Sequence, residues 1–272
     1  MVSEYYSKLK CAARFAENKG HRVGYVALRG SQNYGLATEK SDFDYVVVVI
    51  PSFEDLLRNG WLPVKVYDFE GGHIEIYDIR EYFSCIWKMN PAILETLMTQ
   101  HNIDMTYNKM FESIYSFDIL PMIAVREEKL ARAIKGIFMA YYDKYEKQKD
   151  MGKSIAHMIR LNWFLETLKN NLLFVPNMKE HAPKKLWLTA VMYKSMPNDR
   201  IFQVTDIDTK AYVEFLMEDT FRLCEEVISR SQNSPYRSKE TAYQERIQGR
   251  VSALIEYYIK EEKRKKDEGN QA

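Results

Sequence analysis

The stretch from Leu28 to Ile50, LRGSQNYGLATEKSDFDYVVVVI, decides the fold. A Gly-Ser pair, Gly30 and Ser31, follows one apolar run, and two aspartates, Asp42 and Asp44, stand at the head of the next. The second run, Tyr45 to Ile50, is almost purely β-branched and predicts a buried strand. The two aspartates therefore stand where a central strand begins.

The spacing of these residues indicates a metal and phosphate site. Side chains two residues apart on a strand point to the same face, so Asp42 and Asp44 can present oxygens to one point while Phe43 packs on the other side. Because like charges repel, such a pair favours a hard divalent ion, typically Mg²⁺, that substrate phosphates complete. Gly30 allows a phosphate to approach the backbone closely, and Ser31 adds a hydroxyl.

A third carboxylate is expected from a neighbouring strand. In HIEIY, Glu75 alternates with apolar residues and can face the same site. Three carboxylates suit two metal ions, one holding a triphosphate and the other lowering the pKa of an acceptor hydroxyl. If Glu75 faces the core instead, Asp78 is the nearest alternative, although Asp78 equally suits a helix N-cap.

The wider pattern predicts an α+β protein. Strand-like runs cluster in the first third of the chain, at 23–28, 45–50, 64–68 and 73–77, the last two joined by a glycine-containing turn. From Ile79 onward the apolar spacing becomes helical, as in the runs 130–145, 153–172, 182–192, 210–229 and 244–260. We expect a boundary near 116–121, with residues 1–118 and 119–272 forming two domains.

Composition bounds the protein class. The 272 residues carry a formal net charge of +1, so no global field favours nucleic acid or a membrane surface. The three cysteines lie far apart without CxxC spacing, which is typical of free thiols in a reducing compartment. No signal core or membrane-spanning apolar stretch occurs, so we expect a soluble cytoplasmic protein. The GxxxxGK[ST], GxGxxG, GxSxG and HExxH motifs are missing.

The Gly30-Ser31 pair, Asp42 and Asp44 at the head of a hydrophobic strand, and the later apolar-Glu-apolar triplet around Glu75 together resemble the signature of the DNA polymerase β-like nucleotidyltransferase superfamily. Three segments resemble its bacterial and phage "predicted nucleotidyltransferase" family most closely: RGSQNYGLATEKSDFD, IYDIREYFSCIWKMNPAILETL and SIAHMIRLNWFLETL. The resemblance implies a small mixed β-sheet flanked by helices and an all-helical C-terminal region. It also implies metal-dependent transfer of an NMP from an NTP, with Mg²⁺ or Mn²⁺ as cofactor and ATP as the expected donor. One departure concerns the third carboxylate, because position 73, two before Glu75, is histidine.

The third resembling segment also suggests a nucleotide-binding helix. Lys153, His157 and Arg160 recur at helical spacing and form one stripe. Because the resemblance implies that a helix of the second domain faces the cleft, we expect Lys153 and Arg160 to hold phosphate oxygens and His157 to lie nearer the nucleotide. A solvated helix face with one partly buried histidine is the alternative. Arg29 and Arg80 are further cations near the cleft, or else structural ion pairs.

The sequence leaves the acceptor and the activity open. The acceptor can be an RNA end, a protein or a small molecule. A catalytically inactive protein that kept the fold to bind a nucleotide or a partner is the alternative to an enzyme. RNA binding through the Lys/Arg-rich helices between Arg126 and Lys153 and the basic tail from Lys260 to Lys266 is a further case, although both segments also carry many acids.

Overall fold

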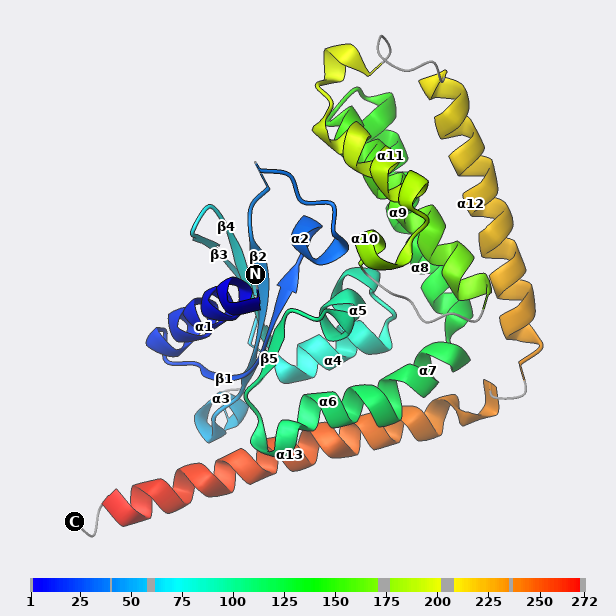
Figure 1. Cartoon of the computed structure of the whole chain (residues 1–272). Coiled ribbons are helices and arrows are strands. Elements are labelled where there is room, and N and C mark those ends of the chain that lie inside the picture. The colour runs from blue at the N-terminus through cyan, green and yellow to red at the C-terminus, as the bar shows by residue number, and fades with distance from the viewer. Residues whose placement is uncertain are drawn as a thin grey trace.

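A five-stranded sheet forms the first part of the molecule, with the strand order β3-β4-β2-β1-β5 (Figure 1). Strands β2 and β4 are parallel, and the other neighbours are antiparallel. The strands are β1 (Arg22–Arg29), β2 (Asp44–Ile50), β3 (Lys65–Phe69), β4 (Gly72–Asp78) and β5 (Asn102–Asp104). The predicted small mixed sheet is therefore confirmed, and β5 is an addition that the sequence analysis missed.

The computed structural model describes residues 2–39, 41–57, 62–170, 177–201, 208–234 and 237–269. Within these ranges, no helix combines the length and apolar character needed to cross a bilayer.

Helix α1 (Val2–Asn18) covers one face of the sheet. Its buried residues Leu9, Ala12 and Ala16 join the alternate strand residues of that face, such as Val47 and Ile74, in one apolar cluster. Phe43 packs against this cluster, as its position between the two aspartates predicts.

The opposite face of the sheet carries the second and larger core. Helix α2 (Ser31–Tyr34) follows β1, and α4 (Ile79–Trp87) and α5 (Pro91–Met98) follow β4. Asp78 caps α4 by accepting a hydrogen bond of 2.8 Å from the Arg80 amide, and the Asn90 side chain caps α5. Asp78 is fully buried in this capping role, which accounts for it without a part in a metal site.

Beyond the sheet the chain is helical, as predicted. Helices α8 (Glu127–Glu146), α11 (Lys184–Ser195) and α12 (Thr209–Gln232) pack around α9 (Met151–Lys169), which is buried along nearly its whole length. Even polar residues of α9, such as Ser154 and Asn162, are therefore buried. Short α10 (Met178–His181) precedes α11. The end of the predicted helix 153–172, at 171 and 172, lies outside the described residues.

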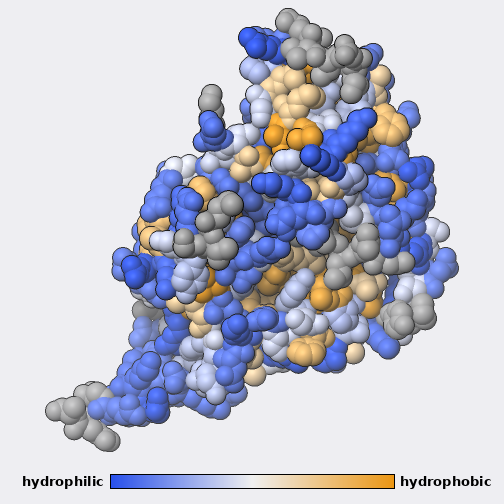
Figure 2. All heavy atoms as spheres, viewed as in Figure 1, coloured by the Kyte–Doolittle hydropathy of each residue, from blue (hydrophilic) through white to orange (hydrophobic). Residues whose placement is uncertain are grey.

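The final helix, α13 (Glu240–Gly269), returns to the sheet half of the molecule (Figure 1). It packs against α4, α6 (Met110–Ile114), the π-helix η2 (Tyr115–Ile119) and α7 (Leu120–Val125). The expected boundary at 118 and 119 falls inside η2, within a continuous run of helical turns. The projecting end of α13 is hydrophilic (Figure 2).

Candidate active site

The Gly-Ser pair and the two aspartates line one pocket of about 390 Å³. Strand β2 begins at Asp44, so Asp42 precedes the strand instead of lying in it, contrary to the expectation that both are strand residues. Asp42 is nevertheless exposed to the same pocket. The two carboxylates thus meet at the start of the central strand, where the sequence predicts them.

Asp44 is the more enclosed of the two carboxylates. Its Oδ1 accepts a hydrogen bond of 3.2 Å from the backbone amide of His73 on the neighbouring strand β4. Burial raises the pKa of Asp44, and the like charge of Asp42 raises it further. A cation between the two carboxylates would relieve this repulsion, so the pair fits a divalent ion with oxygen ligands.

Gly30 brings the backbone close to this acidic pair. Its φ of +75° and ψ of −153° form a conformation that only glycine adopts readily. A Cβ atom at position 30 would lie 3.0 Å from Oδ2 of Asp44. The glycine therefore leaves room for the Asp44 carboxylate to lie close to the backbone.

Glu75 lies in the same pocket, but its carboxylate is already paired. Arg29 forms an ion pair with Glu75 Oε2, and the Tyr77 hydroxyl donates to the same oxygen at 2.9 Å. In the described part of the chain, no three histidine, cysteine, aspartate or glutamate side chains are arranged to hold a metal ion. The structure therefore brings Glu75 to the site without assembling the expected trio of free carboxylates.

Helix α9 supplies the opposite wall of the pocket through Lys153 and His157. Lys153 is exposed, whereas His157 is only 7% exposed and its ring stacks on Tyr141, with 4.5 Å between centroids. Among the described residues, none forms a hydrogen bond with the buried Nδ1 atom of His157. Burial, reinforced by nearby Arg160, lowers the pKa of His157 well below its ordinary value, so the imidazole is neutral at pH 7.

Arg160 is the expected site residue that the structure does not bring to the pocket. It is 5% exposed, and its Nη1 donates to Glu95 Oε1 on α5 at 2.8 Å. The guanidinium lies 3.7 Å from the ring centroid of Tyr34, which lines the pocket. Arg160 thus contacts α2 and α5 instead of lining the pocket, and its expected role in phosphate binding stays a prediction.

Lys194 on α11 is a site residue that the sequence analysis missed. Its Nζ donates to the Leu36 carbonyl at 2.9 Å and the Ser41 hydroxyl at 3.2 Å, both in the connection that leads to Asp42. Burial and the neighbouring charge of Lys153 lower the pKa of Lys194 to about 8. No sequence motif marks this lysine, because only the packing of α11 on α9 brings it to the pocket.

The two walls of the pocket carry opposite charges. The sheet wall presents Asp42 and Asp44, and the helical wall presents Lys153 and Lys194. A metal ion would be attracted to the first wall and a polyphosphate to the second. The pocket therefore combines an acidic wall suited to a cation with a basic wall suited to an anion.

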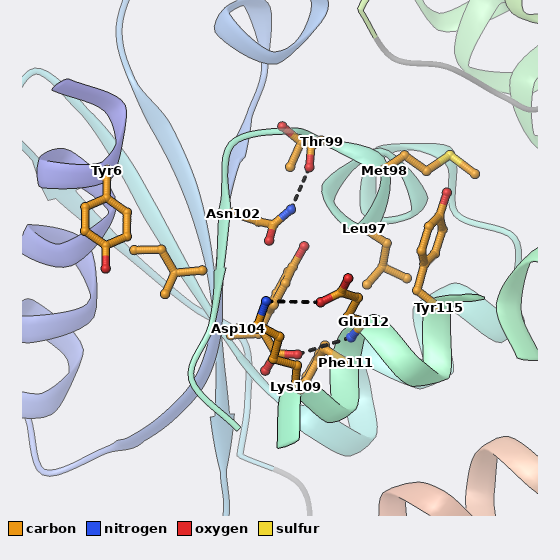
Figure 3. A pocket seen from close by; sticks show the side chains of 12 residues that line it. Tyr6, Leu97, Met98, Thr99, Asn102, Asp104, Lys109, Phe111, Glu112 and Tyr115 are labelled. Atoms are coloured by element: carbon orange, nitrogen blue, oxygen red, sulfur yellow. Dashed lines mark hydrogen bonds and ion pairs between the residues drawn. The ribbon is translucent and has the colours of Figure 1, made fainter. Parts of the chain in front are cut away.

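A second pocket, of about 570 Å³, lies at the edge strand β5, and its polar side chains pair with one another (Figure 3). There the Asn102 side chain donates to the Thr99 carbonyl, and Lys109 pairs with Glu112 at 3.6 Å. Asp104 accepts from the Glu112 amide. Because these polar groups are paired with one another, this pocket offers a ligand fewer free partners than the pocket at Asp44.

One of three comparisons with known proteins finds a family that matches most of the chain. The family model described as RlaP, the RNA repair pathway DNA polymerase beta family, matches residues 6–192, which is more than half of the chain. Among solved structures, a nucleotidyltransferase-like protein from Exiguobacterium sibiricum 255-15 is 11% identical, with a TM-score of 0.28. That match covers 92% of this chain and 90% of the other. No match was found among curated proteins.

Proposed function

The chain belongs to the RNA repair pathway DNA polymerase beta family, and from this premise we propose that it is a metal-dependent nucleotidyltransferase acting on RNA. It would transfer an NMP from an NTP, with ATP as the expected donor, to a hydroxyl group at an RNA end. The family description supports RNA over a protein or small-molecule acceptor, since it names an RNA repair pathway.

One observation carries the proposal, the division of charge across the pocket. Two carboxylates at the start of β2 face two lysines from α9 and α11 in a volume of about 390 Å³. A protein that bound only a neutral ligand would not need both. We further propose that residues 1–118 form the catalytic domain and 119–272 the region that closes the nucleotide pocket.

Asp42 and Asp44 would hold the divalent ion, Mg²⁺ or Mn²⁺. Their mutual repulsion, which contributes to the raised pKa of Asp44, is the physical reason that a cation fits there. When bound, such an ion neutralises charge on the triphosphate and lowers the pKa of the acceptor hydroxyl.

The residues of the chain then bind and orient the nucleotide. Gly30 and Ser31 lie against the phosphates, while Lys153 and Lys194 offset the charge of the β- and γ-phosphates. The neutral His157 ring and Tyr141 form the wall nearer the nucleoside. The acceptor oxygen forms a bond to the α-phosphorus, the bond from that phosphorus to the bridging oxygen breaks, and pyrophosphate leaves with the electron pair. The hydroxyl proton passes to solvent.

An inactive nucleotide-binding protein is the second candidate, and one specific contact favours it. Glu75 is engaged by Arg29 and Tyr77, so the third carboxylate expected of an active two-metal site is not free. Such a protein would bind an NTP through the same pocket and release no pyrophosphate.

Pyrophosphate release in the presence of NTP, Mg²⁺ or Mn²⁺ and RNA tests the proposal. We expect Asp44→Asn to lower the rate by at least about 100-fold while the protein stays folded, because one of two metal-holding carboxylates is lost. Asp267→Asn, which changes an exposed carboxylate far along α13, is the matched control and should keep the full rate.

Two results would count against the proposal. Equal rates in wild type and Asp44→Asn would show that the acidic pair is not catalytic. Metal-dependent NTP binding that Asp44→Asn loses, without any pyrophosphate release by wild type, would instead support the inactive binding protein.

A further inference from the structure

Arg29 and Glu75 flank the acidic pair from the two strands on either side of β2. Arg29, the last residue of β1, lies opposite Asp44 in the antiparallel pairing of β1 and β2. Glu75 lies opposite Val46 in the parallel pairing of β2 and β4. Because strand side chains alternate, Arg29, Asp44 and Glu75 share the sheet face that forms the pocket.

The Glu75 carboxylate is held by two neighbouring side chains. Glu75 receives the guanidinium of Arg29 and the hydroxyl of Tyr77 on the same oxygen, Oε2. The side chains of Arg29 and Glu75 are only 27% and 24% exposed. Burial acts to lower the pKa of Arg29, but the acidic groups around it, Glu75 first and then Tyr34, Tyr77 and Glu95, together outweigh burial and the pKa is raised. The guanidinium is therefore charged, and Glu75 is the counter-charge paired with it.

Moving Glu75 to a metal ion would leave this guanidinium partly buried without its counter-charge. Separating such a pair is unfavourable, since the remaining partner keeps the cost of burial and loses the attraction that offset it. Asp42 and Asp44 face no such competition, because no described cation is paired with either of them. The metal-holding role therefore fits the two aspartates and not Glu75.

The guanidinium has donors left for a ligand. It carries five N–H groups in a planar fork, and the ion pair to Glu75 joins one of its terminal nitrogens, Nη1. Arg29 also immediately precedes Gly30, where a phosphate can approach the backbone. A planar, fixed cation next to a phosphate position is suited to the oxygens of a phosphoryl group that gains charge during transfer.

We propose that Arg29 is a catalytic residue that binds the oxygens of the α-phosphate during transfer, and that Glu75 and Tyr77 position it instead of binding metal. This inference rests on the proposed nucleotidyltransferase function. The bonds made and broken are those of the transfer itself, and Arg29 gives up no proton. Glu75 is a positioning residue here, because it acts through Arg29.

Metal binding without nucleotide separates the two roles of the acids. We would titrate the full-length protein with Mn²⁺ and measure free Mn²⁺ by electron paramagnetic resonance in wild type, Glu75→Gln and Asp44→Asn. The Mn²⁺ affinity of Glu75→Gln should stay within about twofold of wild type, whereas Asp44→Asn should weaken it by about tenfold or more. Circular dichroism would confirm that each variant is folded.

Kinetics then test the role of Arg29. Arg29→Ala should lower kcat by about 100-fold or more with a smaller change in KM for the NTP, because the contact strengthens as charge develops. Added guanidinium ion should restore part of the rate in Arg29→Ala and have no such effect in wild type. Glu75→Gln should lower kcat in the same direction as Arg29→Ala.

Three results would overturn the inference. A loss of Mn²⁺ affinity in Glu75→Gln as large as that in Asp44→Asn would make Glu75 a metal ligand. An unchanged kcat in Arg29→Ala would remove Arg29 from catalysis while leaving the metal site intact. Unchanged Mn²⁺ binding in both acid variants would overturn the proposed metal site, and with it the inference that depends on it.

Discussion

Under the proposed function, Lys194 attracts the phosphates and also holds the loop that leads to Asp42. It hydrogen-bonds the Leu36 carbonyl and the Ser41 hydroxyl, and it also faces the pocket. Its lowered pKa, about 8, follows first from burial and then from Lys153. The other charged groups that act on it come from three elements or their connections: Asp42, Asp44 and Arg160.

The pKa of Lys194 predicts a pH dependence of nucleotide affinity. Below about pH 8 the ammonium group is charged and attracts the triphosphate, whereas above that pH it loses its proton and the attraction fades. Affinity for a non-hydrolysable NTP analogue, measured by calorimetry, should therefore fall as pH rises from 7 to 9.5. Because the bound polyanion favours the charged lysine, the midpoint in the complex should lie above that of the free protein.

Lys194→Arg is the matched comparison, since arginine stays charged throughout this range. Its affinity should decrease much less between pH 7 and 9.5 than that of wild type. Parallel curves for the two proteins would mean that Lys194 does not contribute to phosphate binding.

For single residues, the sequence predicts the face of the sheet on which a side chain lies better than it predicts which side chain it contacts. The positions of Asp44 and Glu75 on one sheet face follow from strand alternation, so they could be predicted. The pairing of Glu75 with Arg29 depends on the strand order, in which β2 separates β1 from β4, and no local pattern encodes that order. The contact of Arg160 with Glu95 could not be predicted for a similar reason, because the two residues lie 65 positions apart in the chain.

At the level of helices, the packing of α11 against α9 brings Lys153 and Lys194 into one pocket. It depends on a glycine at the start of α9. A Cβ atom at Gly152 would lie 2.1 Å from the Tyr193 carbonyl oxygen and 3.0 Å from that of Met196. Both are backbone atoms, so the helices must move apart to admit any side chain.

Gly152→Ala should destabilise the protein by about 1–3 kcal/mol, because the added methyl group overlaps a fixed backbone. It should also weaken NTP binding, since α11 carries Lys194. Denaturant unfolding measures the first effect and calorimetry the second.

Gly136→Ala provides the control for helix propensity. Gly136 lies in the exposed part of α8, and a Cβ atom there meets no atom within 4 Å. This change should stabilise the protein by about 0.5–1 kcal/mol. Equal effects of the two alanines would contradict close packing between α9 and α11.

Most elements were predictable, and the exceptions have physical causes. The strands around the Gly-Ser and Asp motifs and the long helices have clear periodicity, which sequence patterns report well. Strand β5 has only three residues and is held by its pairing with β1, so it lacks a pattern of its own. The end of α13 continues beyond the predicted run, to Gly269, through an alternation of charged residues.

On the scale of the whole molecule, charge is balanced overall and divided locally. The net charge of +1 gives no hint of the acidic and basic walls that meet at the pocket. The two walls come from regions far apart in the chain, and folding brings them together. Composition therefore predicts the absence of a global field and nothing about the local one.

In the basic tail, Lys260 to Lys266, the positive charges are offset locally. Lys260, Arg264, Lys265 and Lys266 lie on α13, and each pairs with a glutamate three or four residues away. Their charge is thus offset on the same helix, which is typical of a solvated surface. This weakens the tail as an RNA-binding surface and leaves the acceptor to be sought near the pocket at Asp44.

Transfer of labelled NMP to RNA is the reaction that separates an RNA nucleotidyltransferase from a protein that only binds NTP. The protein would be incubated with each of four α-³²P-labelled NTPs, Mg²⁺ or Mn²⁺ and total cellular RNA, beside Asp42→Asn/Asp44→Asn. We expect label on RNA that depends on the metal ion, is strongest with ATP and is lost in the double variant. Label that appears equally with the double variant, or no metal-dependent label with any NTP, would contradict it.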